Sequence, residues 1–290
     1  MKPPIFIIGN PRSGTTLFRL MLTSHPAIVI PPECGFAIWW QKKYHDWTAD
    51  CAASARAGEF IADLFSSKKI ETWNLESKNL LAQIQAVRPN DYSALVSLVY
   101  EFYAASHKPG FQRWGDKNNF HIRHIPDLHA LFPQAQFLHI TRDGRDVACS
   151  YRQLGEAKIT SAYAPKLARD ITVIAEEWKS NLEAVDAAFQ SLPVAQKMEI
   201  RYEDLVQQTE KTLRAVCAFL GEPYDSQMLN YHQLNREHAL EPAEFLQWKA
   251  KTLEAPDASA LGKFRTQLTA EEISAFENVA ADQLRKHLYL

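Results

Sequence analysis

The sequence is poor in cysteine and has no long apolar run. It has four cysteines among 290 residues, with no C-x-x-C pair or other metal-binding spacing; such scattered thiols are typical of reduced, buried small side chains. No apolar run approaches the roughly 18 residues that a membrane helix needs, and no signal peptide is visible before the first apolar segment. These absences predict a cytoplasmic protein without a membrane span.

An excess of positive charge is also missing. The formal net charge is -2 and the pI is about 6.6, which gives no basic footprint for a nucleic acid. Repeats, low-complexity tracts and Gly/Ser linkers are absent as well. With 46% hydrophobic and 23% charged residues, the composition is that of a globular protein with a substantial core. We expect a single domain over residues 1–290.

Periodicity predicts strands alternating with helices. Such alternation favours an α/β fold with a central parallel sheet flanked by helices, and a ligand at the carboxyl ends of the strands. Residues 36–106 have helical patterns without strand patterns, so we expect a helical insertion there. A loop is expected over 254–265, and Thr269 opens the last helix with a capping-box pattern. Strands are predicted at Ile5–Ile8, Phe111–Trp114, Gln136–Ile140 and Met198–Tyr202, and helices at Leu17–Ser24, Ile122–Phe132, after Asp143-Gly144, at Leu167–Phe189 and at Glu210–Leu220.

The segment Gly9–Thr16, GNPRSGTT, follows the first predicted strand and precedes a helix. A glycine loop in this position presents backbone N–H groups at a helix N-terminus, which attracts a phosphate. Arg12 adds a planar fork that can grip two oxygens. The hydroxyls of Ser13, Thr15 and Thr16 add further donors beside Gly14. A tight turn without a ligand is the alternative, and these details favour the phosphate site.

The lysine of a P-loop NTPase is absent from this segment. Thr15 stands in its place, and Arg142 follows the predicted strand Gln136–Ile140 where such enzymes carry an aspartate for Mg²⁺. Both differences argue against ATP. The sequence therefore predicts a phosphate site that uses side-chain cations and no metal.

Two motifs resemble a known family. IFIIGNPRSGTTLFRLMLTSHP resembles the 5′-phosphosulfate loop of sulfotransferases that use 3′-phosphoadenosine 5′-phosphosulfate (PAPS), and FPQAQFLHITRDGRDVACSY resembles their 3′-phosphate motif. IRYEDLV, TLRAVCAFLG and ALGKF continue the resemblance, which is nearest to tyrosylprotein sulfotransferases and related bacterial enzymes. The resemblance implies a P-loop-like sulfotransferase fold and transfer of a sulfuryl group to a hydroxyl or amine, leaving adenosine 3′,5′-bisphosphate. The donor ends at its sulfuryl group, so no γ-phosphate requires a lysine.

The resemblance assigns the 3′-phosphate to Arg142 and Ser150. These residues bridge the end of a strand and the following helix, where a guanidinium and a hydroxyl could converge on a dianion. The alternative is an ion pair between Arg142 and Asp143 or Asp146, and the glycine loop makes the phosphate site the better hypothesis. We expect Arg145 to be a structural charge.

Two further residues have catalytic counterparts in the family. Glu33 lies in a proline-braced loop and resembles the base that takes the acceptor's proton; a solvated loop glutamate is the alternative. Lys117 is the candidate for neutralising charge on the bridging oxygen, although Asn118 and Asn119 follow it where relatives often have a small residue and proline. Arg12 is expected to share this role. Tyr202 and Lys263 match positions near the nucleotide.

The remaining candidates concern metals and the acceptor. His121, His124 and His129 have spacings that do not favour a metal site. The aromatic segment following Glu33 is more often core than binding site, but it could wall an acceptor pocket. The acceptor is expected to be a small molecule, a carbohydrate or a peptide, and the protein a monomer or homodimer. The alternatives are a P-loop small-molecule kinase and a non-catalytic nucleotide-binding module. The aromatic residues are Phe36, Trp39, Trp40, Tyr44 and Trp47.

Overall fold

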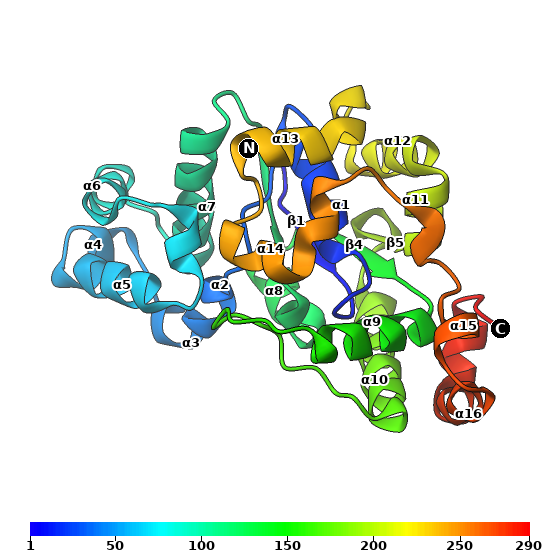
Figure 1. Ribbon diagram of the computed structural model, residues 1–290. Coiled ribbons are helices and arrows are strands. Elements are labelled where there is room, and N and C mark those ends of the chain that lie inside the picture. Colours follow the sequence, from blue (N-terminus) through cyan, green and yellow to red (C-terminus); the bar gives the residue numbers. More distant parts are fainter.

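A five-stranded, wholly parallel sheet forms the centre of the protein (Figure 1). The computed structural model describes residues 1–290 and orders the strands β2-β3-β1-β4-β5. The predicted α/β fold is therefore confirmed. The strands are β1 (Ile5–Ile8), β2 (Ile28–Val29), β3 (Arg113–Lys117), β4 (Gln136–Thr141) and β5 (Lys197–Arg201).

Strand β1 lies in the middle of the sheet and is buried on both faces. Ile5 and Ile7 pack into one hydrophobic cluster, while Phe6 and Ile8 pack into another. Side chains alternate between the faces of a strand, so a continuous apolar run can fill two cores at once. The prediction from the run IFII is confirmed.

Helices cover both faces of the sheet. The Ile5 face packs against α1 (Thr15–Thr23), α12 (Thr209–Leu220) and α13 (Tyr231–His238). The Phe6 face packs against α7 (Tyr92–His107) and α8 (Ile125–Leu131). A third cluster joins α9 (Gly144–Glu156), α10 (Ile171–Ser191) and α16 (Ala270–Lys286). The shorter elements of the second half are η3 (Val194–Gln196), α11 (Tyr202–Gln207), η4 (Ser226–Asn230), α14 (Ala243–Lys249), η5 (Ala250–Leu253), η6 (Ala258–Ala260) and α15 (Phe264–Gln267).

Between β2 and β3 the chain forms helices joined by short loops and no strand, as predicted for residues 36–106. These helices project from one side of the sheet as a lobe, drawn in blue and cyan in Figure 1. Phe36, Tyr44 and Trp47 are buried in its core, which agrees with the core interpretation of the aromatic segment. The elements are α2 (Phe36–Trp39), α3 (Gln41–Tyr44), α4 (Ala49–Ala52), α5 (Ala55–Ser66), η1 (Ile70–Trp73), α6 (Ser77–Val87) and α7.

Several predicted elements have different bounds. Helix α10 begins at Ile171 and not at Leu167, β5 ends at Arg201, and η6 and the start of α15 lie in the segment expected to be a loop over 254–265. The strand expected at Phe111–Trp114 begins two residues later and runs to Lys117. The apolar pattern missed its last residues because the three charged side chains of the strand are buried against partners. The helix expected at Ile122–Phe132 is divided into η2 (Asn119–Arg123) and α8, with Pro126 in the first turn of α8. Strand β2 was not predicted, because two residues are too short for a periodic pattern. None of the helices has the length and apolarity required to cross a bilayer.

Candidate active site

The loop between β1 and α1 has the conformation of an anion site. Arg12 adopts φ 68° and Gly14 φ 91°, so two residues lie in the left-handed region that non-glycine residues avoid. No side chain caps α1, and its first turn has no acidic residue. The Oγ of Ser13 is fully buried without a hydrogen-bond partner. Unpaired donors at a helix N-terminus fit an anionic group.

Arg12 and Arg142 meet over this loop without an acidic partner. Arg12 Nε donates to Ser150 Oγ at 3.0 Å, and its Nη1 donates to the carbonyl of Trp248 at 3.2 Å. Arg142 donates to the carbonyls of Arg12 and Ala260 at 3.1 and 2.9 Å, and its Nε has no partner. Burial and the charge of Arg142 lower the pKa of Arg12. Two adjacent guanidinium groups that lack a carboxylate would gain strongly from a bound dianion.

The alternative ion pairs for Arg142 do not form. Asp143 pairs with Arg145 at 2.8 Å, while Asp146 accepts from the backbone N–H groups of Gly262 and Phe264 at 2.7 and 3.0 Å. Arg145 also pairs with Glu277, so it is the structural charge that we expected. Arg142 instead stacks over Tyr202, with 4.6 Å between its guanidinium carbon and the ring centroid.

Glu33 and Lys117 form an ion pair beside the loop. Lys117 ends β3, is fully buried, and also donates to Thr16 Oγ1 at 3.3 Å. Burial lowers the pKa of Lys117 to about 8, and Glu33 offsets part of this effect. Burial would raise the pKa of Glu33, but the charges of Lys117, Lys249 and Lys69 outweigh it and hold that pKa well below its usual range. An ionised carboxylate and an ammonium therefore lie together at this end of the sheet.

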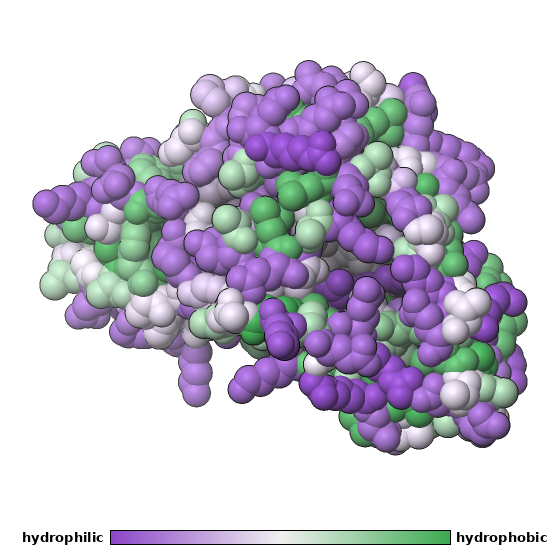
Figure 2. Space-filling model, in the orientation of Figure 1, coloured by the Kyte–Doolittle hydropathy of each residue, from purple (hydrophilic) through white to green (hydrophobic).

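Most predicted site residues lie at the carboxyl ends of the strands, whereas Ser150 lies in α9 and Lys263 lies between η6 and α15. The glycine loop follows β1, Glu33 follows β2, Arg142 follows β4, and Tyr202 follows β5. Nine of the eleven predicted site residues line one cleft of about 400 Å³. Lys117 contacts Thr16 in the lining of this cleft, and Ser13 is buried in the loop beneath it. Figure 2 shows the surface hollowed on this face, with hydrophilic residues around the hollow. Lys263 also lines the cleft.

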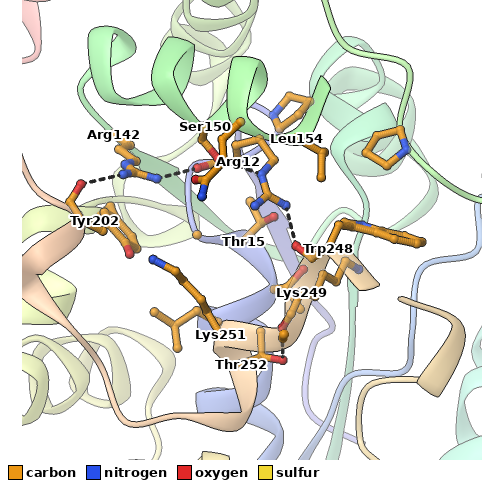
Figure 3. Close-up of a pocket in the computed structure, with 18 of the residues that line it drawn as sticks. Arg12, Thr15, Arg142, Ser150, Leu154, Tyr202, Trp248, Lys249, Lys251 and Thr252 are labelled. Carbon is orange, nitrogen blue, oxygen red and sulfur yellow. Dashed lines mark hydrogen bonds between the residues drawn. The ribbon is translucent and has the colours of Figure 1, made fainter. Parts of the chain in front are cut away.

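Sequence reasoning missed one wall of the cleft. Trp248, Lys249, Lys251 and Thr252, from α14 and η5, line the cleft together with Arg12 and Arg142 (Figure 3), and the carbonyl of Trp248 accepts from Arg12. Lys69, at the start of η1, donates to Glu33 Oε2 at 2.6 Å. These residues stand in no recognisable motif, and only their distance in space to Glu33 and Arg12 reveals them.

The histidine and aromatic candidates lie outside the cleft. His121 is buried, His124 pairs with Asp127 at 2.8 Å, and His129 contacts Gln196, so the three do not converge on a common point. None of the five aromatic residues between Phe36 and Trp47 lines the cleft. The interpretation of this segment as a pocket wall is therefore not supported by the structure.

The fold and the site together define an α/β protein with a P-loop-like anion site at the carboxyl ends of its strands. The model of the sulfotransferase family matches residues 3–226, and the chain belongs to this family. It is similar to protein-tyrosine sulfotransferase A of Caenorhabditis elegans, with 26% identity over 240 residues, covering 80% of this chain and 53% of the relative. The chain thus spans about half the length of that relative.

Solved sulfotransferase structures share the fold. The sulfotransferase domain from the curacin biosynthetic pathway superposes with a TM-score of 0.65 and 21% identity, covering 98% of each chain. Mouse sulfotransferase SULT7A1 complexed with PAP superposes with a TM-score of 0.52 and 12% identity, covering 98% of this chain and 84% of that one. The family match ends at residue 226, so the wall formed by α14 and η5 lies beyond it.

Proposed function

We propose that the protein transfers the sulfuryl group of PAPS to a hydroxyl or amine acceptor. One observation carries this proposal: Arg12 and Arg142 lack acidic partners in the same cleft in which Glu33 is paired with Lys117. Two cationic sites suit the two phosphate positions of the donor, and a carboxylate beside them suits proton abstraction. Membership of the sulfotransferase family and the PAP complex of the mouse relative support the same donor.

The residues divide into three roles. Arg142, Ser150 and Tyr202 would hold the 3′-phosphoadenosine end, with Lys263 beside them. Ser13, Gly14, Thr15 and Thr16 would hold the 5′-phosphate through the loop and the open N-terminus of α1. Glu33 would take the proton of the acceptor. Ser150 already accepts a hydrogen bond from Arg12 Nε, so a dianion at Arg142 would lie within reach of both arginines.

PAPS supplies an electrophilic sulfur, and attack by the acceptor oxygen would form an S–O bond while the bond to the 5′-phosphate breaks. Glu33 holds the released proton. Lys117 and Arg12 stabilise the negative charge that develops on the bridging oxygen. The cations required are present as side chains, and independence from metal stays a prediction. Cytoplasmic location, a single domain and a monomeric or dimeric state also stay predictions.

Nucleotide preference tests the donor. The protein should bind adenosine 3′,5′-bisphosphate at least tenfold more tightly than ADP or ATP without Mg²⁺, because one charge-assisted contact is worth roughly 1.5–3 kcal/mol. Isothermal calorimetry measures all three affinities. Equal affinity for ADP, or ATP binding that requires Mg²⁺, would favour a kinase instead.

Substitution of the base tests the reaction. Labelled PAPS is offered with phenols, sugars, amines and tyrosine peptides, and Glu33→Gln is compared with the wild type on every acceptor that is labelled. We expect kcat to fall by about 10²–10⁴-fold, since glutamine cannot take the proton. Affinity for adenosine 3′,5′-bisphosphate should be unchanged or tighter, because the substitution frees Lys117 and Lys69. A near-normal kcat would remove Glu33 from the mechanism.

A further inference from the structure

Three ammonium groups from three separate elements surround the carboxylate of Glu33. Lys117 comes from β3, Lys69 from the start of η1 and Lys249 from the end of α14. Lys69 Nζ lies 2.6 Å from Oε2, and Lys249 Nζ lies 3.9 Å from Oε1, the oxygen that Lys117 also contacts. The Glu33 side chain is 15% exposed, so these charges act on it with little screening.

Lys117 cannot serve Glu33 throughout the proposed reaction. Its ammonium is the group placed to stabilise the bridging oxygen of the donor, and a single ammonium that turns to this oxygen leaves the carboxylate. The incoming phosphates and sulfonate are themselves anionic, and nearby negative charge favours protonation of a carboxylate. A base in this cleft therefore needs positive charge that stays with it when the donor is bound.

Lys69 and Lys249 are both fixed in place. Both ammonium groups lie near the buried ring of Phe245, with Lys69 Nζ 5.2 Å and Lys249 Nζ 4.9 Å from its centroid. The backbone of Lys69 has φ 75°, a strained conformation of the kind found at functional sites. Contacts from the helical lobe and from α14 thus converge on one carboxylate.

A buried ion-pair chain anchors Lys249. Its Nζ contacts Glu241 at 2.6 Å, and Glu241 contacts Arg19 at 2.5 Å. The Arg19 and Glu241 side chains are at most 2% exposed, and Arg19 lies on α1, the helix that follows the glycine loop. The chain therefore connects the second ammonium at Glu33 to the nucleotide-binding helix.

We propose that Lys69 and Lys249 are positioning residues that keep Glu33 ionised and oriented toward the acceptor while the donor occupies the cleft. The inference rests on the proposed function, since it assigns Glu33 the part of a base. The other charged or titratable groups that act on Glu33 are Lys117 and Asp116 of β3 and His121 of η2. Glu241, before α14, contacts Lys249. Burial lowers the pKa of His121 to about 3, so this imidazole is neutral near neutral pH. Burial raises the pKa of Asp116 to about 7, and a carboxyl group adds no positive charge in either form.

A direct titration of Glu33 tests the inference. Infrared difference spectra, wild type minus Glu33→Gln, report the Glu33 carboxylate of the protein bound to adenosine 3′,5′-bisphosphate. Lys69→Met should raise the pH at the midpoint of the Glu33 titration by at least about one unit, as expected for loss of an opposite charge within about 4–6 Å. Lys69→Arg should restore it, and Lys68→Met should leave it unchanged because Lys68 has no ion pair. An unmoved midpoint in Lys69→Met overturns the inference.

Lys249→Met alone would leave the buried carboxylate of Glu241 without this ion-pair partner, so Lys249 is tested with a double variant. Lys249→Met with Glu241→Gln removes both charges of that pair, and thermal melting verifies the fold. The midpoint of the Glu33 titration should again rise, by less than in Lys69→Met, because loss of the Glu241 carboxylate offsets part of the loss of the Lys249 ammonium. The acid limb of labelled sulfuryl transfer from PAPS to water should move upward with it. A fall in rate at every pH with an unmoved midpoint would overturn the positioning role. If the wild type transfers no sulfuryl group but the midpoint of the Glu33 titration still shifts in the variants, the proposed function is wrong. The lysines would then still be shown to keep Glu33 ionised.

Discussion

At the scale of single residues, Arg142 and Arg145 differ sharply although they are three positions apart. Arg145 has two acidic partners, Asp143 and Glu277, and its side chain is 6% exposed. Arg142 has none and contacts only backbone carbonyls and the face of Tyr202. A guanidinium that is already neutralised stabilises the fold, whereas one that is not remains available to a ligand.

The two arginines therefore give opposite predictions. Arg142→Ala should lower the affinity for adenosine 3′,5′-bisphosphate at least tenfold, the effect of roughly 1.5–3 kcal/mol for a charge-assisted contact, and should leave the melting temperature nearly unchanged. Arg145→Ala should lower the free energy of unfolding by on the order of 2–4 kcal/mol, because it leaves Asp143 and Glu277 without their ion-pair partner. Calorimetry and thermal melting of both variants check this. The reverse pattern would make Arg142 the structural residue.

At the scale of elements, the loop before α1 depends on its second glycine. Gly14 has φ 91°, and a Cβ there would lie 2.4 Å from Cδ2 of Tyr202. The ring of Tyr202 in turn lies under Arg142. The loop, the start of α11 and the end of β4 thus fit together only without a side chain at position 14.

Gly14→Ala should consequently impair nucleotide binding more than it impairs folding. The left-handed conformation costs an alanine about 1–2 kcal/mol, and the clash pushes Tyr202 away from Arg142. Affinity for adenosine 3′,5′-bisphosphate is compared with that of Gly14→Ala combined with Tyr202→Ala, which removes the clash and retains the strain. Near-normal affinity in the single variant would show that the loop tolerates a side chain there.

At the scale of the whole molecule, the C-terminal residues fasten the last helix to the edge of the sheet that carries Arg142 and Tyr202. His287 contacts Glu199 of β5 at 2.9 Å and Asp186 of α10 at 3.6 Å. The Tyr289 hydroxyl lies within hydrogen-bond distance of Thr141 Oγ1 and Glu203 Oε2, at 3.2 and 3.1 Å, and the Tyr289 carbonyl accepts from Arg145. Burial would lower the pKa of His287, but hydrogen bonds to Asp186 and Glu199 outweigh it and raise the pKa to about 9.

This attachment should weaken at alkaline pH. Since the folded pKa lies above the unfolded value of about 6.5, the contribution of His287 is complete below pH 6.5 and is lost as the pH rises through 9. Lys286 and His139 also face this cluster, so the comparison is between wild type and His287→Gln. The two proteins should differ in free energy of unfolding by on the order of 2 kcal/mol at pH 6, a value reduced because the 40%-exposed Glu199 is partly screened by solvent. This difference should shrink toward pH 9.5. A constant difference over that range would contradict the raised pKa.

The sequence by itself determined the parallel α/β fold and the glycine loop, and it named candidate site residues, nine of which line one cleft in the structure. The apolar runs of β1 and β4, the glycine loop and the capping box of α16 are local features, in which neighbouring residues suffice to specify a conformation. The structure has Thr269 capping α16 with Glu272 as the reciprocal partner. The residue assignments for catalysis came from the family resemblance, and their roles stay predictions.

Only the tertiary structure decided which charges meet. Lys117 and Lys69 are 84 and 36 positions from Glu33, and Lys249 is farther along the chain, in a segment without a motif. Strand β3 is charged at Arg113, Asp116 and Lys117, yet it is buried because each side chain finds a partner from another element. Parallel strands gather their carboxyl ends at one edge of the sheet. Whether a charge there is neutralised or left for a ligand depends on distances in space, which spacing along the chain does not specify.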